Sequence, residues 1–281
     1  MYNLIRTLVF DEQVSLTVAD TTQIVQTAIE KHTLSFSSAR VLGKALSLMT
    51  FAASGLKSET GEISLAVQTD GNGGSIGVSG NRALYMRGYI ANSQASGDER
   101  ATFGTNGSVT IIRDDGYARP FVGSCAFPAK SGVDAAFEEY YRISEQLPTR
   151  IATSVVLDEQ GNCLFAGVAA LQPLPFTDEN TKQKTEQTDL YALLEETRVS
   201  GVAAAIKGRF VPAVSVWEER NAIYKCNCSR ERLKGVMVSL GESQIREIIK
   251  EDGTISVHCH YCNTDYQFTD KDADELFAST T

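Results

Sequence analysis

The chain has 281 residues, of which 42% are hydrophobic, so it can bury a large core and is expected to contain more than one folded unit. Its formal net charge of −9 argues against nucleic-acid binding as its main activity. No signal peptide is expected, and the longest apolar stretch, residues 45–56, is too short to span a bilayer. These features predict a cytoplasmic protein with neither a nucleic-acid nor a membrane partner.

The first part of the chain alternates between strand-like and helix-like patterns. Strands are expected at residues 5–10, 14–18, 63–69, 75–78, 83–90, 109–113, 120–126, 150–157 and 163–171. Helices are expected to begin at Thr21 or Thr22, at Ser37 or Ser38, and at an S-x-x-D box that joins Ser131 to Asp134. Because the helices are segregated from a long run of strands, the pattern predicts an α+β fold, with a mixed sheet and packed helices, for a domain over residues 1–176.

Residues 177–224 are expected to form a metastable linker region. Residues 177–189 are almost wholly polar, whereas Leu190, Leu193 and Leu194 form a short apolar face that ends at a break at Gly201. Residues 210–217 alternate enough to predict a strand. Because so few apolar residues cannot form a core, we expect the segment to fold only against a surface supplied by the rest of the chain.

Four cysteines near the end of the chain define a predicted C-terminal domain over residues 225–281. Cys226 and Cys228 form a C-x-C pair, Cys259 and Cys262 form a C-x-x-C pair, and 30 residues lie between the pairs. Two cysteine pairs on tight turns suit a tetrahedral metal held by four thiolates. In a cytoplasmic protein, cysteines more often serve metal or redox chemistry than structural disulfides. The sequence therefore predicts one zinc ion per chain in the reduced form.

Other interpretations of the cysteines remain open at this level. A purely structural zinc site, in a constitutive adaptor for a protein or RNA partner, is the main alternative. A thiol–disulfide oxidoreductase is less favoured, because its C-x-x-C motif would open a helix, whereas Cys259 follows a short strand. His258 and His260 are expected outside the ligand set, and Cys125 and Cys163 as small buried residues. No catalytic residue is predicted, and the protein is not expected to be an enzyme.

The cysteine motifs resemble those of the Hsp33 family of redox-regulated chaperones. The resemblance is carried by residues 226–232 (CNCSRER) and 257–263 (VHCHYCN), with Tyr266 and Phe268 after them. In the N-terminal part, residues 67–74 (VQTDGNGG), 87–89 (RGY) and 140–149 (YYRISEQLPT) are also similar to that family. The resemblance thus covers essentially the whole chain.

The resemblance implies an ATP-independent holdase that binds unfolding client proteins under oxidative stress. In its reduced, inactive form Cys226, Cys228, Cys259 and Cys262 would hold zinc. Oxidation would form the disulfides Cys226–Cys228 and Cys259–Cys262, release the zinc, unfold the C-terminal domain and the linker, and favour a homodimer. Of the three pairings that four cysteines allow, this one leaves the 30-residue span between the pairs unclosed. It is therefore compatible with unfolding.

Overall fold

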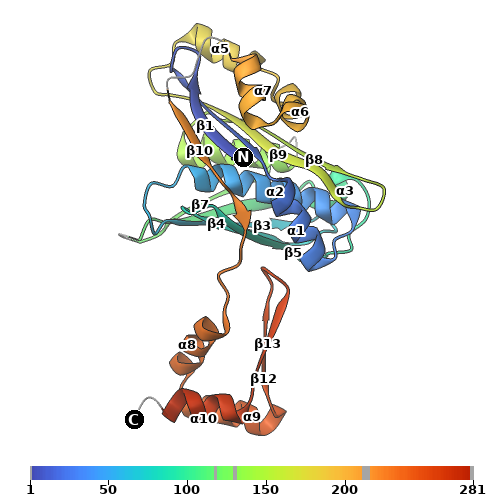
Figure 1. Ribbon diagram of the computed structural model, residues 1–281, viewed down its shortest axis with the longest axis vertical. Helices are drawn as coiled ribbons and strands as arrows, with labels where there is room; N and C mark the ends of the chain where they lie inside the picture. The colour runs from blue at the N-terminus through green and yellow to red at the C-terminus, as the bar shows by residue number, and fades with distance from the viewer. Residues whose placement is uncertain (1, 117–118, 129–131, 211–215, 279–281) are drawn as a thin grey trace. The chain divides into compact units, whose positions relative to one another are not determined.

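The computed structural model describes residues 2–116, 119–128, 132–210 and 216–278. The chain forms two compact units, Met1–Lys225 and Cys226–Thr281 (Figure 1). The first combines β-sheets with packed helices, and the second is a small unit of helices and one hairpin. The predicted α+β fold class is confirmed. No helix in the described part of the chain is both long and apolar enough to cross a membrane.

Two sheets form the frame of the first unit. Their strand orders are β10-β1-β2-β9-β8 and β11-β5-β4-β3-β6-β7. The bounds are β1 Leu4–Val9, β2 Val14–Asp20, β3 Glu62–Thr69, β4 Ile76–Asn81, β5 Tyr85–Ile90, β6 Gly107–Asp114, β7 Phe121–Ala126, β8 Arg150–Leu157, β9 Cys163–Pro173, β10 Trp217–Arg220 and β11 Ile223–Tyr224. Neighbouring strands are antiparallel, except that β11 runs parallel to β5. All nine strands predicted before residue 176 are present.

Helix α2, Phe36–Ser54, packs against strands of both sheets and forms the centre of the main core (Figure 1). Its buried residues lie all around the helix, which is typical of a helix enclosed by protein. Gly43 allows close packing, because a Cβ atom there would lie 2.9 Å from Val25 of helix α1, Thr22–His32, and 3.0 Å from Val155 of β8. The two sheets are thus held together by one nearly continuous apolar element.

Two helix starts show how local hydrogen bonds override the predicted caps. Helix α1 begins at Thr22, as predicted. The prediction for α2 was wrong, since Ser35 is the capping residue and its hydroxyl accepts a hydrogen bond from the Ser38 amide. Ser37 and Ser38 already lie within the helix, where they cannot cap it. A short helix that was not predicted, α3, spans Glu99–Phe103.

Helix α4, Val133–Tyr140, is tied to the first sheet by a buried carboxylate. It continues into a π-helical turn, η1, at Tyr141–Glu145. Ser131, the expected first residue of the S-x-x-D box, lies outside the described residues. Asp134 accepts hydrogen bonds from the amide and hydroxyl of Thr153 on β8, and one from the Tyr191 hydroxyl at 3.0 Å. Burial raises the pKa of Asp134, although these donors and Lys44 oppose the increase.

Residues 177–224 pack within the first unit as helices α5 Glu179–Gln187, α6 Leu190–Ser200 and α7 Val202–Arg209, followed by β10 and β11. The leucine face predicted on α6 is buried against residues of the first sheet. Gly201, with a φ of 84°, separates α6 from α7 where a break was predicted. Of the strand predicted at residues 210–217, residues 211–215 lie outside the described part, and β10 begins at Trp217. That this segment acts as a separate metastable linker stays a prediction.

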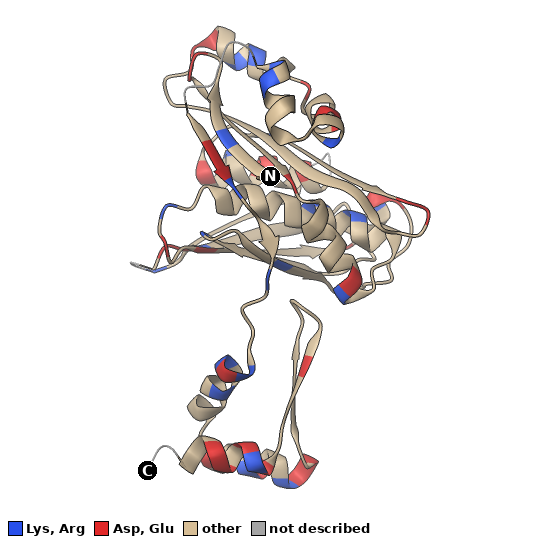
Figure 2. Ribbon diagram, in the orientation of Figure 1, with Lys and Arg blue, Asp and Glu red and all other residues tan. Residues whose placement is uncertain are grey.

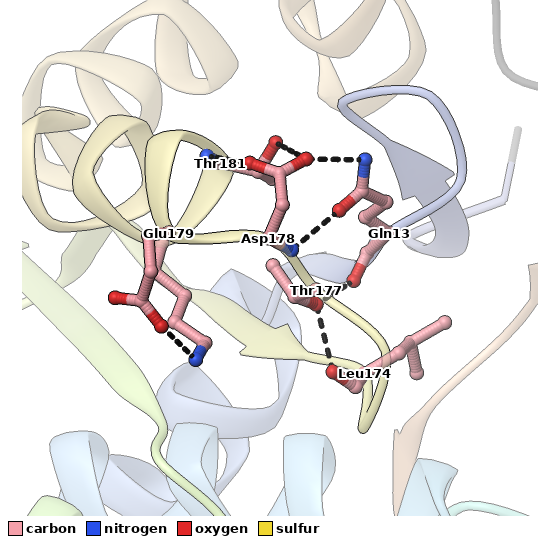
Figure 3. Close-up of polar contacts among 7 residues, drawn as sticks. Gln13, Leu174, Thr177, Asp178, Glu179 and Thr181 are labelled. Atoms are coloured by element: carbon pink, nitrogen blue, oxygen red, sulfur yellow. Dashed lines mark hydrogen bonds and ion pairs between the residues drawn. The ribbon is translucent and has the colours of Figure 1, made fainter.

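Side-chain hydrogen bonds hold the start of α5 against the turn between β1 and β2 (Figure 3). Asp178 caps α5 by accepting a hydrogen bond from the Thr181 amide at 2.8 Å, and it also accepts one from Gln13 Nε2 at 2.9 Å. Gln13 Oε1 accepts a hydrogen bond from the Asp178 amide at 2.8 Å. The Thr177 hydroxyl donates to the Gln13 carbonyl oxygen at 2.6 Å. The polar stretch is therefore a helix anchored by polar contacts.

The C-terminal unit consists of α8 Arg230–Leu240, α9 Glu242–Asp252, the hairpin β12 Ile255–Cys259 and β13 Thr264–Phe268, and α10 Asp270–Ala278. Ser229 caps α8, as predicted, by accepting a hydrogen bond from the Arg232 amide at 3.1 Å. The second helix begins at Glu242, one residue before the predicted start at Ser243. Five buried residues form its core: Met237, Ile245, Ile249, Phe268 and Ala273. This core is small for an independently folded unit.

Candidate metal centre

Two turns bring the four C-terminal cysteines together. Cys226 and Cys228 lie in the extended segment that precedes α8. Cys259 ends β12, and Cys262 lies in the hairpin turn, where its amide donates a hydrogen bond to the Cys259 carbonyl oxygen at 3.3 Å. Asn263 completes that turn with a φ of 54°, a conformation that asparagine tolerates better than most residues. The 30 residues between the pairs form α8, α9 and β12, which return the chain to its starting point.

The four sulfur atoms all lie within 4.8 Å of one another. Cys226 Sγ lies 3.8 Å from Cys259 Sγ, and Cys228 Sγ lies 3.2 Å from Cys262 Sγ. Tetrahedral zinc with Zn–S bonds of about 2.3 Å requires sulfur atoms about 3.8 Å apart. All four thiols are free of disulfide bonds. The donor set, its number and its spacing therefore fit a four-thiolate metal centre, and in the described part of the chain this is the one such cluster.

The surroundings of the thiols differ from one cysteine to the next. Cys262 is buried, whereas Cys226, Cys228 and Cys259 are half-buried. Burial raises the pKa of Cys226 and of Cys262. Burial also opposes ionisation of Cys228, but hydrogen bonds from Tyr266 and from the neighbouring thiols outweigh it and lower its pKa to about 7. A metal ion bound to these sulfurs would deprotonate the thiols outright.

Two residues around the centre were not assigned a role from the sequence. The Tyr266 hydroxyl on β13 lies 3.2 Å from Cys228 Sγ, and the Thr264 hydroxyl lies 3.3 Å from Cys262 Sγ. Tyr266 pairs across the hairpin with Val257, which places its side chain on the same face as the centre. Hydroxyl groups at these distances can donate to thiolate sulfurs and so orient them. The short spacing from Cys262 was the available signal in the sequence.

The remaining histidines and cysteines lie apart from the cluster. His258 Nδ1 lies 2.7 Å from Asp265 Oδ1, and the rings of His258 and His260 meet edge to face at 5.0 Å. Cys125 on β7 is buried in the main core, as predicted, and burial raises its pKa. Cys163 at the start of β9 is only partly buried, and burial raises its pKa to about 12. Neither thiol has the electropositive, exposed setting of a reactive cysteine.

Comparisons with known proteins agree with this geometry. A family model described as "Hsp33 protein" matches residues 3–269. The chain is 31% identical to the "33 kDa chaperonin" of Bacillus cytotoxicus and 30% identical to that of Bacillus cereus strain AH187; each alignment covers 97% of both proteins. Its structure matches the crystal structure of the 33 kDa chaperonin from Thermotoga maritima with a TM-score of 0.80 and 25% identity. That match covers 99% of this chain and 98% of that chain.

The family model and the relatives cover almost the entire chain, including both the two-sheet unit and the cysteine unit. The resemblance found from the cysteine motifs is confirmed. These relatives are named as chaperonins, which is a non-enzymatic role. The chain therefore belongs to the Hsp33 family of chaperones.

Proposed function

We propose that this protein is an ATP-independent holdase that is inactive while Cys226, Cys228, Cys259 and Cys262 hold one zinc ion, and active once these thiolates are oxidised. The observation that carries the proposal is the convergence of four free sulfurs within 4.8 Å in a unit with a five-residue core. Bound zinc would hold the four thiolates deprotonated and would join the segment before α8 to the hairpin turn. The two segments have thirteen-residue-scale separation from any other covalent tie, so their association rests on the cluster and the small core.

The energies support a unit that depends on its metal. Structural zinc contributes about 10–16 kcal/mol to small zinc-binding domains at neutral pH. A unit of this size would have only about 3–8 kcal/mol if it were as stable per residue as an average domain. We therefore expect Cys226–Thr281 to unfold when its thiolates are oxidised. No other part of the described chain depends on so few buried residues.

Oxidation would convert each cysteine pair to a disulfide. Each pair would lose two electrons to an oxidant such as hypochlorous acid, and its two thiolate sulfurs would join in one S–S bond. We propose the pairs Cys226–Cys228 and Cys259–Cys262 because neighbour pairing leaves the intervening 30 residues free to unfold. Sulfur proximity does not select among the three pairings, since all four sulfurs are close in the reduced centre.

Unfolding of the C-terminal domain, residues 225–281, would reach the linker, residues 177–224, and leave residues 1–176 as the folded chaperone core. Trp217, the single tryptophan, lies within this linker and is half-buried, with Lys207 Nζ 5.1 Å from its ring centroid. Its emission should therefore move to the red on oxidation, and limited proteolysis should cut first between residues 177 and 224. The active form would bind unfolding client proteins and form a homodimer. The cytoplasmic location expected from the sequence stays a prediction.

An aggregation assay tests the proposal. Light scattering from a thermally unfolding client should be suppressed strongly by the oxidised, zinc-free protein and much less by the reduced, zinc-loaded protein. Client refolding by ATP is not required at any stage, so omission of ATP should change nothing. Equal suppression by both forms would exclude the redox switch and would favour a constitutive zinc-binding adaptor.

A further inference from the structure

One short segment covers an exposed edge of each sheet in the first unit. We name Trp217–Tyr224 the edge strap; it contains β10 and β11. β10 is the outermost strand beside β1 in one sheet, and β11 is the outermost strand beside β5 in the other (Figure 1). Eight consecutive residues therefore stand between solvent and the outer edges of two sheets.

The edge strap is held mainly by backbone pairing. β10 pairs with β1 from Leu4 opposite Arg220 to Thr7 opposite Trp217. Beside β5, the Ile223 amide donates to the Leu84 carbonyl oxygen at 3.0 Å, and the Lys225 amide donates to that of Met86 at 2.8 Å. Between the two strands, Asn3 clamps the backbone of Ala222 through hydrogen bonds of 2.8 Å to its carbonyl oxygen and from its amide.

The side chains of the edge strap contribute little buried apolar surface. Ala222 is buried, but Ile223 is 46% exposed. β10 carries acidic and basic residues in succession (Figure 2), which is how proteins keep a sheet edge from pairing with other chains. Arg220 Nη1 is buried without a hydrogen-bond acceptor among the described residues, and the nearest carboxylate oxygen of its ion pair, on Glu218, is 3.8 Å away. An unsatisfied buried donor destabilises the strand that carries it.

Removal of the edge strap would leave two hydrogen-bonding edges with intact sheets behind them. β1 and β5 each have six residues, and each remains paired on its inner side, to β2 and to β4. Their buried side chains, such as Ile5 of β1 and Met86 of β5, belong to the two main cores and would hold the strands in place. An ordered strand with one unpaired edge is a template for strand addition.

We propose that, once the linker has opened, the outer edges of β1 and β5 bind extended segments of unfolded client proteins by strand addition. This inference rests on the proposed function, because it requires release of residues 177–224. Unfolded chains expose unpaired backbone amides and carbonyls whatever their sequence, and strand addition derives its affinity from the main chain. Such recognition suits a chaperone whose clients share no sequence. The edge strap occupies the same positions in the reduced protein and so acts as an internal substitute for the client.

Amide hydrogen exchange on the full-length chain tests the proposal, with reduced and carboxymethylated lactalbumin as a permanently unfolded probe. Residues 4–9 and 85–90 should be protected in the reduced protein, exchange at least about tenfold faster after oxidation, and regain protection when the probe is added. The interior strands β2 and β4 should stay protected throughout. Bound probe without renewed protection at β1 and β5 would overturn the proposal.

A second set of variants separates failure of this inference from failure of the redox switch. Ala222→Asp places a charge at a buried position and should release the edge strap in the reduced, zinc-loaded protein, and Asn3→Ala should do so by removing the clamp. Ile223→Asp alters the exposed neighbour and is the matched control. Reduced Ala222→Asp or Asn3→Ala should bind the probe even if oxidation of the unaltered chain has no effect. Fast exchange at residues 4–9 and 85–90 without probe binding would contradict strand addition directly.

Competition with a matched pair of peptides distinguishes main-chain from side-chain recognition. A ten-residue peptide of alternating valine and threonine should displace the probe from the oxidised protein. The same peptide with its six central amides N-methylated cannot donate backbone hydrogen bonds and should compete about tenfold or more weakly. Equal competition by the two peptides would mean that an apolar surface, and not the strand edges, binds the client.

Discussion

The two units of the chain are stabilised in different ways. Met1–Lys225 has two extensive hydrophobic clusters, one between its sheets and one beneath α6 and α7, whereas Cys226–Thr281 has a core of five buried residues beside four cysteines. The first can remain folded through apolar burial alone. The second depends on what its sulfurs bind, and its stability can therefore respond to an oxidant. This difference places the sensor in one unit and leaves the folded scaffold in the other.

The largest effect should come from removing two of the metal ligands. In the Cys228→Ser Cys262→Ser double variant, stoichiometric zinc should be lost, and residues 226–281 should lose protection from amide exchange because the small core cannot replace about 10–16 kcal/mol of metal binding. β2, β3 and β9 should stay protected. Metal analysis and hydrogen exchange measure both effects. Cys163→Ser is the control and should keep its zinc; retained zinc in the double variant would refute the four-thiolate assignment.

A truncation in the small core should be the next largest effect. Phe268 is fully buried, with the Arg230 guanidinium 4.4 Å from its ring centroid. Phe268→Ala should destabilise the C-terminal unit by about 3–5 kcal/mol and make zinc easier to remove with a chelator. Val238→Ala, at a partly exposed position on α8, should change little. Chelator titrations of the two variants compare them; identical midpoints would show that the apolar core does not support the metal centre.

The same kind of truncation in the first unit should have a different outcome. Leu194 on α6 is fully buried against the first sheet, so Leu194→Ala should destabilise the packing of α6 by about 2–5 kcal/mol without releasing zinc. We expect partial holdase activity in the reduced, zinc-loaded protein. Val199→Ala, at a position that is 77% exposed on the same helix, is the control. Zinc loss in Leu194→Ala would mean that the two units are not separable in this way.

The smallest effect should be that of the hydroxyl beside the centre. Tyr266→Phe removes a hydrogen-bond donor 3.2 Å from Cys228 Sγ while keeping the ring. Loss of such a partner should weaken metal affinity by about 10–100-fold. Competition with a chromogenic chelator measures the affinity. Unchanged affinity would show that Tyr266 packs against the centre without orienting it.

The sequence predicted most of the strands and the four converging cysteines, because alternation and cysteine spacing are local signals. It did not predict which residues would meet across long separations. The caps of α2 and the bonds of Asp134 depend on Ser35 and Thr153, which only the folded chain brings into place. Likewise, β10 and β11 pair with strands more than a hundred residues away, and no local pattern identifies those partners. Tyr266 was noticed as part of a motif, but its contact with Cys228 required the hairpin register.

The most direct test of the account is an oxidant titration in which zinc release and suppression of client aggregation are measured in the same samples. We expect the two curves to coincide and both to reverse when the protein is reduced in the presence of zinc. Full suppression while zinc is still bound, or complete zinc release without any gain in suppression, would contradict the claim that the cysteine unit controls the chaperone.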